Sequence, residues 1–160
     1  MSEKAEKSEK VIPENAPHSN LVLLGDGETF KEQLYQMIER AQLFDDFSRA
    51  DVIVIARYIR AYQIDKKETI FEEGQKGSFM GVLIEGRVDI FKKDDERNKK
   101  RITTIRPGKS MGEMSLLDGF PHSATAIVVE KAKMLIFTHL NFERLLEEQP
   151  IIGVKLLRKI

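Results

Sequence analysis

The sequence predicts a single mainly β domain over residues 21–160, an antiparallel sandwich or barrel with helices before and after it. Residues 63–138 carry a series of short runs rich in β-branched and aromatic residues, separated by glycines and charged turns. On either side, over residues 29–61 and 139–160, the apolar residues recur at helical spacing instead. The length of 160 residues fits one domain with a short extension.

The first part of the chain predicts a tail and two helices. Residues 1–20 should form a disordered tail, because they contain too few apolar groups to offset the entropy of ordering the chain. A helix should begin at Thr29, since Thr29 and Glu32 have the spacing of a capping box. Its apolar face comprises Phe30, Leu34, Met37, Ile38 and Ala41. A second helix should begin at Ser48, with Asp51 in its first turn. Its apolar face comprises Val52, Ile55, Ala56 and Ile59.

Short β-rich runs follow the two helices. The predicted strands contain the runs YQI, TIF, FMGVLI, RVDIF, RITTI, ATAIVV and MLIF. The charged stretch from Lys92 to Arg101 lies between two of them. Because acidic residues dilute its basic charge, this stretch predicts a solvated hairpin loop and not a nucleic-acid patch.

Helical spacing returns at the end of the sequence. Thr138 or Asn141 should cap a helix that ends before Pro150. The apolar face of this helix comprises Leu140, Phe142, Leu145 and Leu146. A last helix carries Ile152, Leu156 and Ile160 on one face. That face continues to the last residue without a stop signal, so we expect the helix to be cut short or to be completed by a partner, such as a second copy in a homodimer.

Composition restricts the classes of partner. The 26 basic and 26 acidic residues cancel, so no overall field attracts the chain to nucleic acid or to an anionic membrane. The absence of cysteine removes disulfides and thiolate sites. The longest aliphatic run, Val52 to Ala56, is far shorter than the about 20 residues that cross a bilayer. The first residues also lack the apolar stretch of a secretory signal. We therefore expect a cytoplasmic protein.

Polar groups gather in the segment from Gly112 to Ala126, GEMSLLDGFPHSATA, between two predicted strands. A short helical turn over 114–117 would direct unpaired backbone N–H groups at one point, where a phosphate could bind. Ser123 would add a hydroxyl donor, and Glu113 would accept a hydrogen bond from a neighbouring sugar hydroxyl. From spacing alone, a plain turn with its leucines in the core is the better explanation, because short motifs have many false positives.

From about Leu43 onward the chain resembles the cyclic-nucleotide-binding domain family, which includes catabolite-activator-like regulators, kinase regulatory subunits and gated channels. The landmarks occur in the family's order: LFDDFS, IFEEG with Gly74, IEGRVDIF with Gly86, RPG with Gly108, GEMSLLDG and PHSATA. The resemblance implies an antiparallel β-roll (double-stranded jelly roll) with flanking helices. It also implies a regulatory sensor, not an enzyme, which requires no cofactor and no metal and whose ligand is a cyclic mononucleotide, cAMP or cGMP.

The resemblance further implies a ligand-binding set. Glu113 is expected to bind a ribose hydroxyl. The backbone amides near Met114 and Ser115 are expected to bind the phosphate, and Ser123 and the Ala124 amide are expected to complete the phosphate site. Three side chains fall where the family places the wall beside the base, although ordinary sheet core is the alternative for the isoleucines. The full set is Gly112, Glu113, Met114, Ser115, His122, Ser123, Ala124, Ile90, Ile102 and Thr103. Leu116 and Leu117 are expected to transmit occupancy to the helix around Phe142 and Leu145.

Two departures from the family pattern affect the site. His122 stands where the family has the arginine that pairs with the cyclic phosphate. With a reference pKa of about 6.5, histidine is mostly neutral at pH 7. Losing the arginine would cost about tenfold to a hundredfold in affinity, which implies weak binding, a different ligand or none. The final helix is also shorter than the family helix that closes over the base.

Two other functions remain open. Metal-dependent cupin enzymes share the jelly roll, but they hold the metal with closely spaced histidines and a carboxylate. Here His18, His122 and His139 are far apart in the sequence. The stronger alternative is a β-roll that has lost its nucleotide and serves as a protein docking or dimerisation module. His122 and the short last helix favour it, whereas Gly112, Glu113 and Ser123 oppose it. The output protein is unknown in either case.

Overall fold

The structure is a computed structural model that describes residues 21–25 and 27–160. Its elements are β1 (Val22–Leu23), α1 (Glu28–Glu39), a short 3-10 helix (Gln42–Phe44), α2 (Arg49–Ile55), β2 (Arg60–Ile64), β3 (Thr69–Phe71), β4 (Phe79–Lys93), β5 (Lys99–Ile105), β6 (Ser110–Met111), α3 (Glu113–Asp118), β7 (Thr125–Thr138), α4 (His139–Glu148) and α5 (Pro150–Leu157). The predicted tail, residues 1–20, lies outside the described residues.

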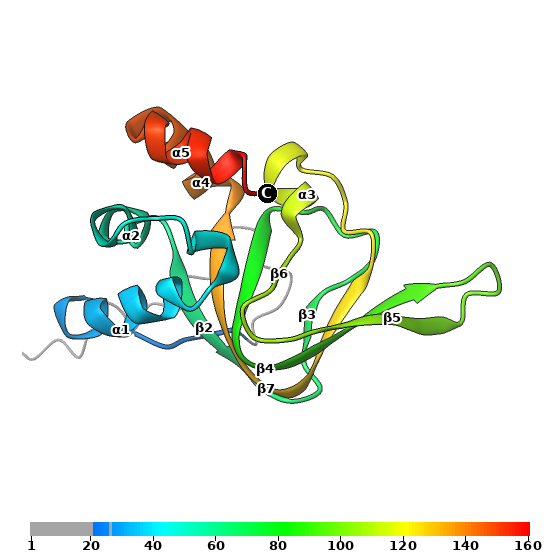
Figure 1. Ribbon diagram of the computed structural model, residues 1–160. Coiled ribbons are helices and arrows are strands. Elements are labelled where there is room, and N and C mark those ends of the chain that lie inside the picture. Colours follow the sequence, from blue (N-terminus) through cyan, green and yellow to red (C-terminus); the bar gives the residue numbers. More distant parts are fainter. Residues whose placement is uncertain (1–20, 26) are drawn as a thin grey trace, which may run out of the picture.

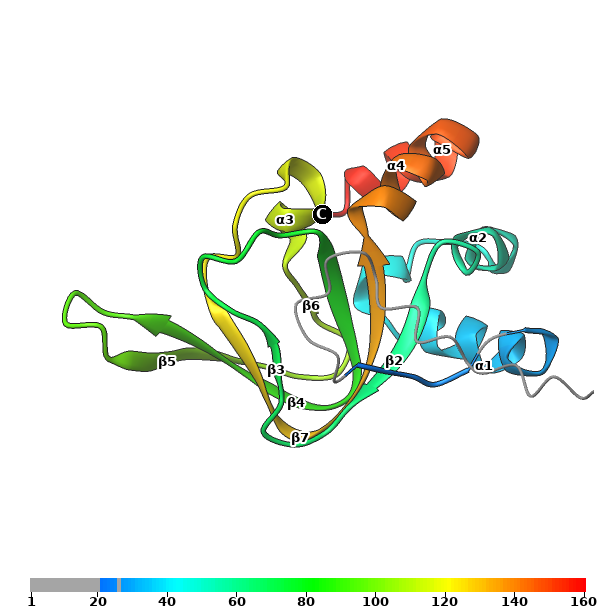
Figure 2. The ribbon, with the colours of Figure 1, turned by 180° about the vertical axis from the view of Figure 1, so that it is seen from behind.

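The strands form one antiparallel sheet that is wound into a roll. Its hydrogen-bonded order is β1-β2-β7-β4-β5, and in addition β3 pairs with β7 and β6 pairs with β4. The long strands β4 and β7 pair from Phe79 with Thr138 to Phe91 with Thr125. Helices α1, α2, α4 and α5 gather on one side of the roll, and the β4–β5 hairpin projects from the other (Figures 1 and 2). The predicted antiparallel β-roll with flanking helices is therefore confirmed.

Two of the strands are longer than the sequence predicted. The runs FMGVLI and RVDIF belong to one strand, β4, and ATAIVV and MLIF both lie in β7. Gly86 separates the first two runs without ending the strand: it has φ +92°, and a Cβ there would collide with the Lys131 carbonyl oxygen. The register shifts on both sides of this glycine, so the sheet bends here and does not stop. The predicted loop from Lys92 to Arg101 is a hairpin with strand residues at both ends.

The N-terminal helical boundaries differ from those predicted. The helix α1 begins at Glu28, and its N-cap is Gly27, without a side-chain hydrogen bond. The prediction of a capping box at Thr29 is therefore wrong, because Thr29 already lies inside the helix. The predicted helical range 29–61 also runs too far. α2 ends at Ile55, and Arg60 already pairs with Ile136 in the sheet, so the roll begins before residue 63.

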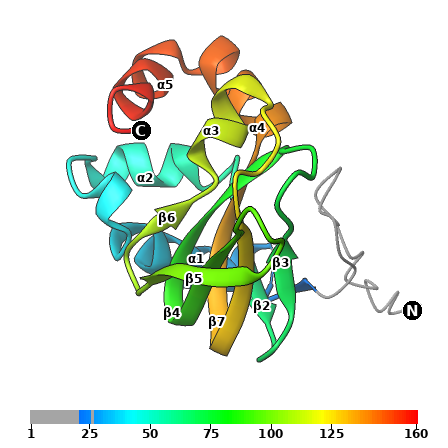
Figure 3. The ribbon, with the colours of Figure 1, turned by 90° about the vertical axis from the view of Figure 1, so that its right-hand side faces the viewer.

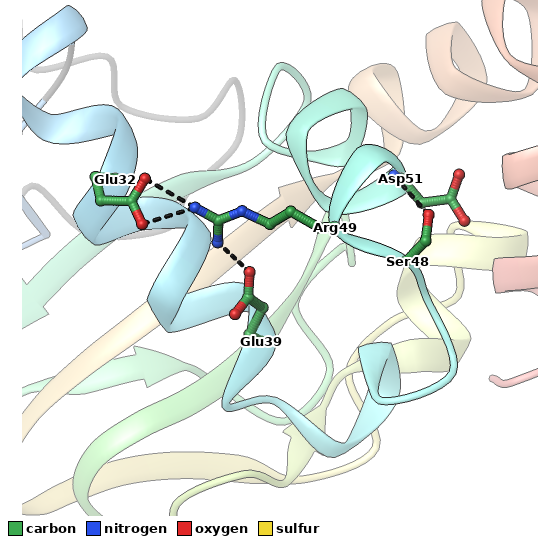
Figure 4. A network of polar contacts seen from close by, with 5 residues as sticks. All are labelled: Glu32, Glu39, Ser48, Arg49 and Asp51. Atoms are coloured by element: carbon green, nitrogen blue, oxygen red, sulfur yellow. Dashed lines mark hydrogen bonds and ion pairs between the residues drawn. The ribbon is translucent and has the colours of Figure 1, made fainter.

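Other local predictions hold. Ser48 accepts a hydrogen bond from the Asp51 amide at the start of α2, and Thr138 accepts one from the Asn141 amide at the start of α4. Figure 4 shows Ser48 beside the network that joins the first two helices. In this network the Arg49 guanidinium binds the carboxylates of Glu32 and Glu39, which project from α1.

The buried side chains form two clusters. One lies between the roll and the helices and includes the predicted faces of α1 and α2, with Phe30 only partly buried. The other lies inside the roll. Phe142 and Leu145 are buried on α4, whereas Leu140 is 56% exposed, which corrects its predicted burial. Leu140 precedes Phe142 by two positions, and this spacing places the two side chains on different sides of the helix.

The last helix, α5, packs against the cluster between the roll and the helices. Leu156 is buried on α5, and Ile152 and Ile160 are partly buried against the same cluster. The helix itself ends at Leu157. No helix in residues 21–25 and 27–160 is long and apolar enough to cross a membrane.

Candidate ligand cavity

A cavity of about 430 Å³ opens between α3, the loop that follows it and the inner face of the roll. α3 lies at one end of the roll, next to β6 (Figure 3). The cavity is lined by Phe71, Ile90, Ile105, Ser110, Met111, Gly112, Glu113, Met114, Ser115, Phe120, Pro121, His122, Ser123 and Ala124. All of the predicted binding set except Ile102 and Thr103 thus lies around one space.

The start of α3 forms the polar edge of the cavity. Gly112 is its N-cap and adopts φ +82°, a conformation that favours glycine. A Cβ at this residue would also lie 3.1 Å from the Phe79 carbonyl oxygen. The predicted helical turn over 114–117 is confirmed, since α3 runs from Glu113 to Asp118. The Glu113 carboxylate accepts a hydrogen bond from the Ser110 hydroxyl, and both residues line the cavity.

The loop after α3 is held by the turn that follows β3. The Ser115 hydroxyl donates to the Phe120 carbonyl at 3.0 Å. Gly77 lies directly against these two residues, and a Cβ there would collide with both. The Gly74 amide donates to the His122 carbonyl at 2.8 Å, and the His122 amide donates to the Gln75 carbonyl at 2.8 Å. The glycines of this turn therefore fix the backbone on which His122 stands.

The His122 ring is buried, with only 4% of the residue exposed. It stacks on Phe71, with ring centroids 3.9 Å apart and planes 11° apart, and it meets Phe79 edge to face at 5.8 Å. This burial lowers the pKa of His122 to about 4, which is below its usual value because the charged form is desolvated. The expected neutral histidine at pH 7 is thus supported by its surroundings.

The hydrogen bonds of His122 also define which ring nitrogen carries the proton. Its Nδ1 lies 3.1 Å from the Ser115 hydroxyl oxygen, whose single hydrogen points to the Phe120 carbonyl. Both contacts are satisfied only if Nδ1 carries the proton and donates. Nε2 is then an acceptor, and it is buried without a partner among the described residues.

The predicted wall beside the base is only partly present. Ile90 is buried and lines the cavity, but Ile102 and Thr103 do not line it. Ile102 is 56% exposed, and its neighbours Arg101 and Thr103 in this part of β5 are exposed as well. It has no partner in β4 where the register shifts from Ile90–Thr103 to Phe91–Arg101. Thr103 pairs with Ile90 in the sheet but remains outside the lining. Phe71 and Ile105 supply apolar wall in their place.

Several lining residues were not predicted. They are Phe71, Ile105, Ser110, Met111, Phe120 and Pro121. Ser110 had a local signal, because it precedes Glu113 by three positions and could have been paired with it. The apolar residues had none, since a residue that lines an apolar wall has the same pattern in sequence as one in the core.

The charge of the cavity comes from one residue. Among its lining residues, all within the described part of the chain, Glu113 is the only acidic residue, and no lysine or arginine is present. Within the same described ranges, no group of three or more His, Cys, Asp or Glu side chains could hold a metal ion. His18 lies outside the described residues.

α3 also contacts the C-terminal helices. Leu116 is fully buried and belongs to the same cluster as Phe142 and Leu145 of α4, and Leu117 packs against that cluster. His139, the first residue of α4, places Nδ1 2.5 Å from the Leu116 carbonyl oxygen. The element that borders the cavity therefore touches the element that follows the roll.

The comparisons with known proteins agree with this arrangement. A family model described as cyclic nucleotide-binding domain matches residues 61–149. A putative potassium channel protein of Rhodopseudomonas palustris is 27% identical over 123 residues, which cover 76% of this chain and 29% of that protein. The cAMP-dependent protein kinase regulatory subunit of Aspergillus fumigatus is 29% identical over 125 residues, which cover 78% of this chain and 30% of that protein.

Among solved structures, a cyclic nucleotide-binding domain from Methylobacillus flagellatus is similar with a TM-score of 0.76 and 26% sequence identity. The match covers 88% of this chain and 79% of that one. The chain spans less than a third of the channel and of the kinase subunit. Because the matched model covers more than half of the sequence, the chain belongs to the cyclic nucleotide-binding domain family.

Proposed function

We propose that the chain is a regulatory sensor module, not an enzyme, that binds a cyclic nucleotide or a close ribose-containing relative in the cavity beside α3. The observation that carries this proposal is the convergence of Gly112, Glu113 and Ser123 on one cavity. Its volume of about 430 Å³ is within the range of about 300–1,000 Å³ that is typical of small-molecule sites. The relatives named as a channel and as a kinase regulatory subunit support a regulatory role.

Each part of the ligand has a partner of suitable chemistry. The Glu113 carboxylate accepts from the ribose, as carboxylate oxygens accept from hydroxyl groups. Its contact with Ser110 holds it at the cavity edge and leaves further acceptor capacity. The base packs against Phe71, Ile90 and Ile105, which form an apolar wall. A phosphate would lie between α3 and the segment from Ser123 to Ala124.

Occupancy is relayed to a partner protein through α4 and α5. α3 borders the cavity with one face and buries Leu116 against α4 with the other. A ligand shifts such an element only if it binds its two positions with different affinity. The relay therefore depends on contacts that α3 makes differently when the cavity is filled.

The docking or dimerisation module is the second candidate, and one observation favours it. His122 stands where a cation would be expected, yet it is buried and neutral, and no lysine or arginine lines the cavity. A domain that no longer binds a nucleotide would have no need of such a cation.

Calorimetric titration of the purified chain with cAMP, cGMP, cyclic dinucleotides and their parent nucleosides tests the sensor proposal. We expect saturable binding by at least one ligand. Glu113→Ala should weaken that binding about tenfold to a hundredfold, because a hydrogen bond to a charged group is lost. Thr103→Ala, which changes a residue outside the lining, is the matched control. If no ligand binds the folded protein at millimolar concentration, the docking module replaces the sensor.

A further inference from the structure

The electrostatics of the cavity are unusual for a site that would receive a phosphate. The Glu113 carboxylate is its sole charged lining side chain among the described residues, and it is negative. A cyclic phosphate would bring a second negative charge into the same space. Like charges that share a partly buried site repel each other, and burying an anion without a paired cation is costly.

His122 does not compensate for this charge. Its ring is neutral at pH 7, because burial lowers its pKa to about 4. In the arrangement set by Ser115, the free nitrogen of the ring is a hydrogen-bond acceptor. Phosphate oxygens are acceptors as well, so a neutral ring in this form cannot donate to them. The ring also forms one layer of a stack with Phe71, which opposes the rotation needed to exchange its nitrogens.

An uncharged nucleoside lacks both conflicts. It keeps the ribose for Glu113 and the base for the wall formed by Phe71 and Ile90. Its 3′ and 5′ hydroxyls are free, whereas a cyclic monophosphate uses both in ester bonds. Free hydroxyls donate hydrogen bonds, and the Glu113 carboxylate at the cavity edge is an acceptor for them. The one charged side chain among the described lining residues thus suits a ligand that carries donors and no charge.

We propose that this cavity selects an uncharged ribonucleoside over the corresponding cyclic monophosphate. This inference rests on the sensor function proposed above, since it names the ligand class of the same site. His122 is the residue that determines the specificity: an arginine in its place would supply a permanent charge and two donors to the phosphate.

Matched titrations of the full chain at pH 7.5 test the inference. Adenosine is compared with cAMP, and guanosine with cGMP, so that each pair differs only in the phosphate. We expect the better nucleoside to bind at least tenfold more tightly than its cyclic monophosphate. 2′-Deoxyadenosine serves as the control for the sugar contact, and it should bind more weakly than adenosine if Glu113 accepts from the 2′-hydroxyl.

Two variants then separate charge from shape. Glu113→Gln keeps the size of the side chain and removes its charge, and His122→Arg adds a charge. Both should shift the preference at least tenfold toward the cyclic monophosphate. The measured quantity is the ratio of two dissociation constants for the same protein, so a uniform loss of folded protein does not change it. Circular dichroism and thermal melts establish that each variant is folded, and Glu113→Gln alone suffices if His122→Arg does not fold.

The outcomes distinguish the two proposals. Tighter binding of the cyclic monophosphate by the wild-type chain overturns the nucleoside inference and leaves the sensor function intact. A nucleoside preference that neither variant changes also overturns it, because the charge of the cavity would then not be its cause. Absence of binding by every ligand at millimolar concentration overturns the sensor function itself, and the inference with it.

Discussion

The ring of His122 is held by Phe71, Phe79 and the Ser115 hydroxyl, none of which is its neighbour in the sequence. The sequence alone indicates that a histidine occupies the place of an arginine. It does not indicate that the ring is buried, because that depends on the turn around Gly77 and on the strand β3. The lowered pKa of this residue leads to two predictions.

The first prediction concerns ligand affinity. For a cyclic monophosphate, protonation of His122 creates a cation beside the phosphate, so the bound pKa lies above the free value of about 4. Affinity for cAMP should therefore rise as the pH falls through the bound pKa and level off below about pH 4. Affinity for adenosine should not rise over the same range. Calorimetry between about pH 4.5 and 8 measures both, and His122→Arg, which stays charged throughout, should give a flat profile for cAMP. Equal profiles for the two proteins would show that the ring does not meet the phosphate.

The second prediction concerns stability without ligand. The pKa of His122 is about 4 in the folded chain and about 6.5 in an unfolded one. Between these values the unfolded chain binds more protons, so the free energy of unfolding should fall as the pH drops from about 6.5 to about 4. The full loss from this residue is on the order of 3 kcal/mol. Urea unfolding at several pH values measures it, and His122→Phe, which retains an aromatic ring without a titrating group, should show a smaller slope. An unchanged slope in this variant would mean that carboxylates alone cause the pH dependence.

At the level of single elements, the helix starts show what local sequence can predict. Ser48 was predicted as a cap and acts as one, since a cap is an interaction within four residues of chain. Of the two caps that the sequence offered for α4, Thr138 or Asn141, Thr138 is the cap. Thr29 was predicted on the same pattern and is not a cap, because the N-cap of α1 is Gly27. The strand that precedes this helix, β1, is paired with β2. Long-range pairing overrides the local signal there.

These helix starts give a prediction with its own control. Ser48→Ala and Thr138→Ala should each lower the free energy of unfolding by about 1 kcal/mol, because each removes an acceptor for a backbone N–H. Thr29→Ala should change it by only a few tenths of a kcal/mol, since Thr29 lies within the first turn of the helix. Denaturant unfolding of the three variants is the measurement. A loss at Thr29 as large as at the other two positions would contradict the observed cap.

The sheet and the site show why other features escaped prediction. Gly86 suggested a break between two strands. In the structure it is a bend within the single strand β4, where the Lys131 carbonyl oxygen lies too close for a side chain at this position. The resemblance placed Ile102 in the wall beside the base, with sheet core as the alternative, but Ile102 lies in the exposed part of the β4–β5 hairpin, at a register shift. Both depend on pairing between distant segments. The segment from Gly112 to Ala124 could be predicted because its polar residues lie close together in the chain and occur in the family's order.

At the level of the whole molecule, α3 lies at the boundary between the two buried clusters. The cluster inside the roll contains Ile90, Met111 and Ala124, which line the cavity. The cluster between the roll and the helices contains Leu116, Phe142 and Leu145. Packed side chains therefore connect α3, which borders the cavity, with the buried face of α4.

This position predicts a relay that hydrogen exchange can measure. With the ligand that binds more tightly in calorimetry, adenosine or cAMP, amide protection in residues 139–157 should change together with protection in α3. Residues 99–105, in the hairpin strand β5, should change little.

The variant His139→Ala tests the contact between α4 and the Leu116 carbonyl. The substitution removes this contact, and it removes little packing because the His139 ring is about half exposed. This variant should reduce the change in 139–157 and keep the affinity within a few-fold, because His139 does not line the cavity. If α3 becomes protected and residues 139–157 do not respond in the wild-type chain, the cavity and the C-terminal helices are not coupled through this contact.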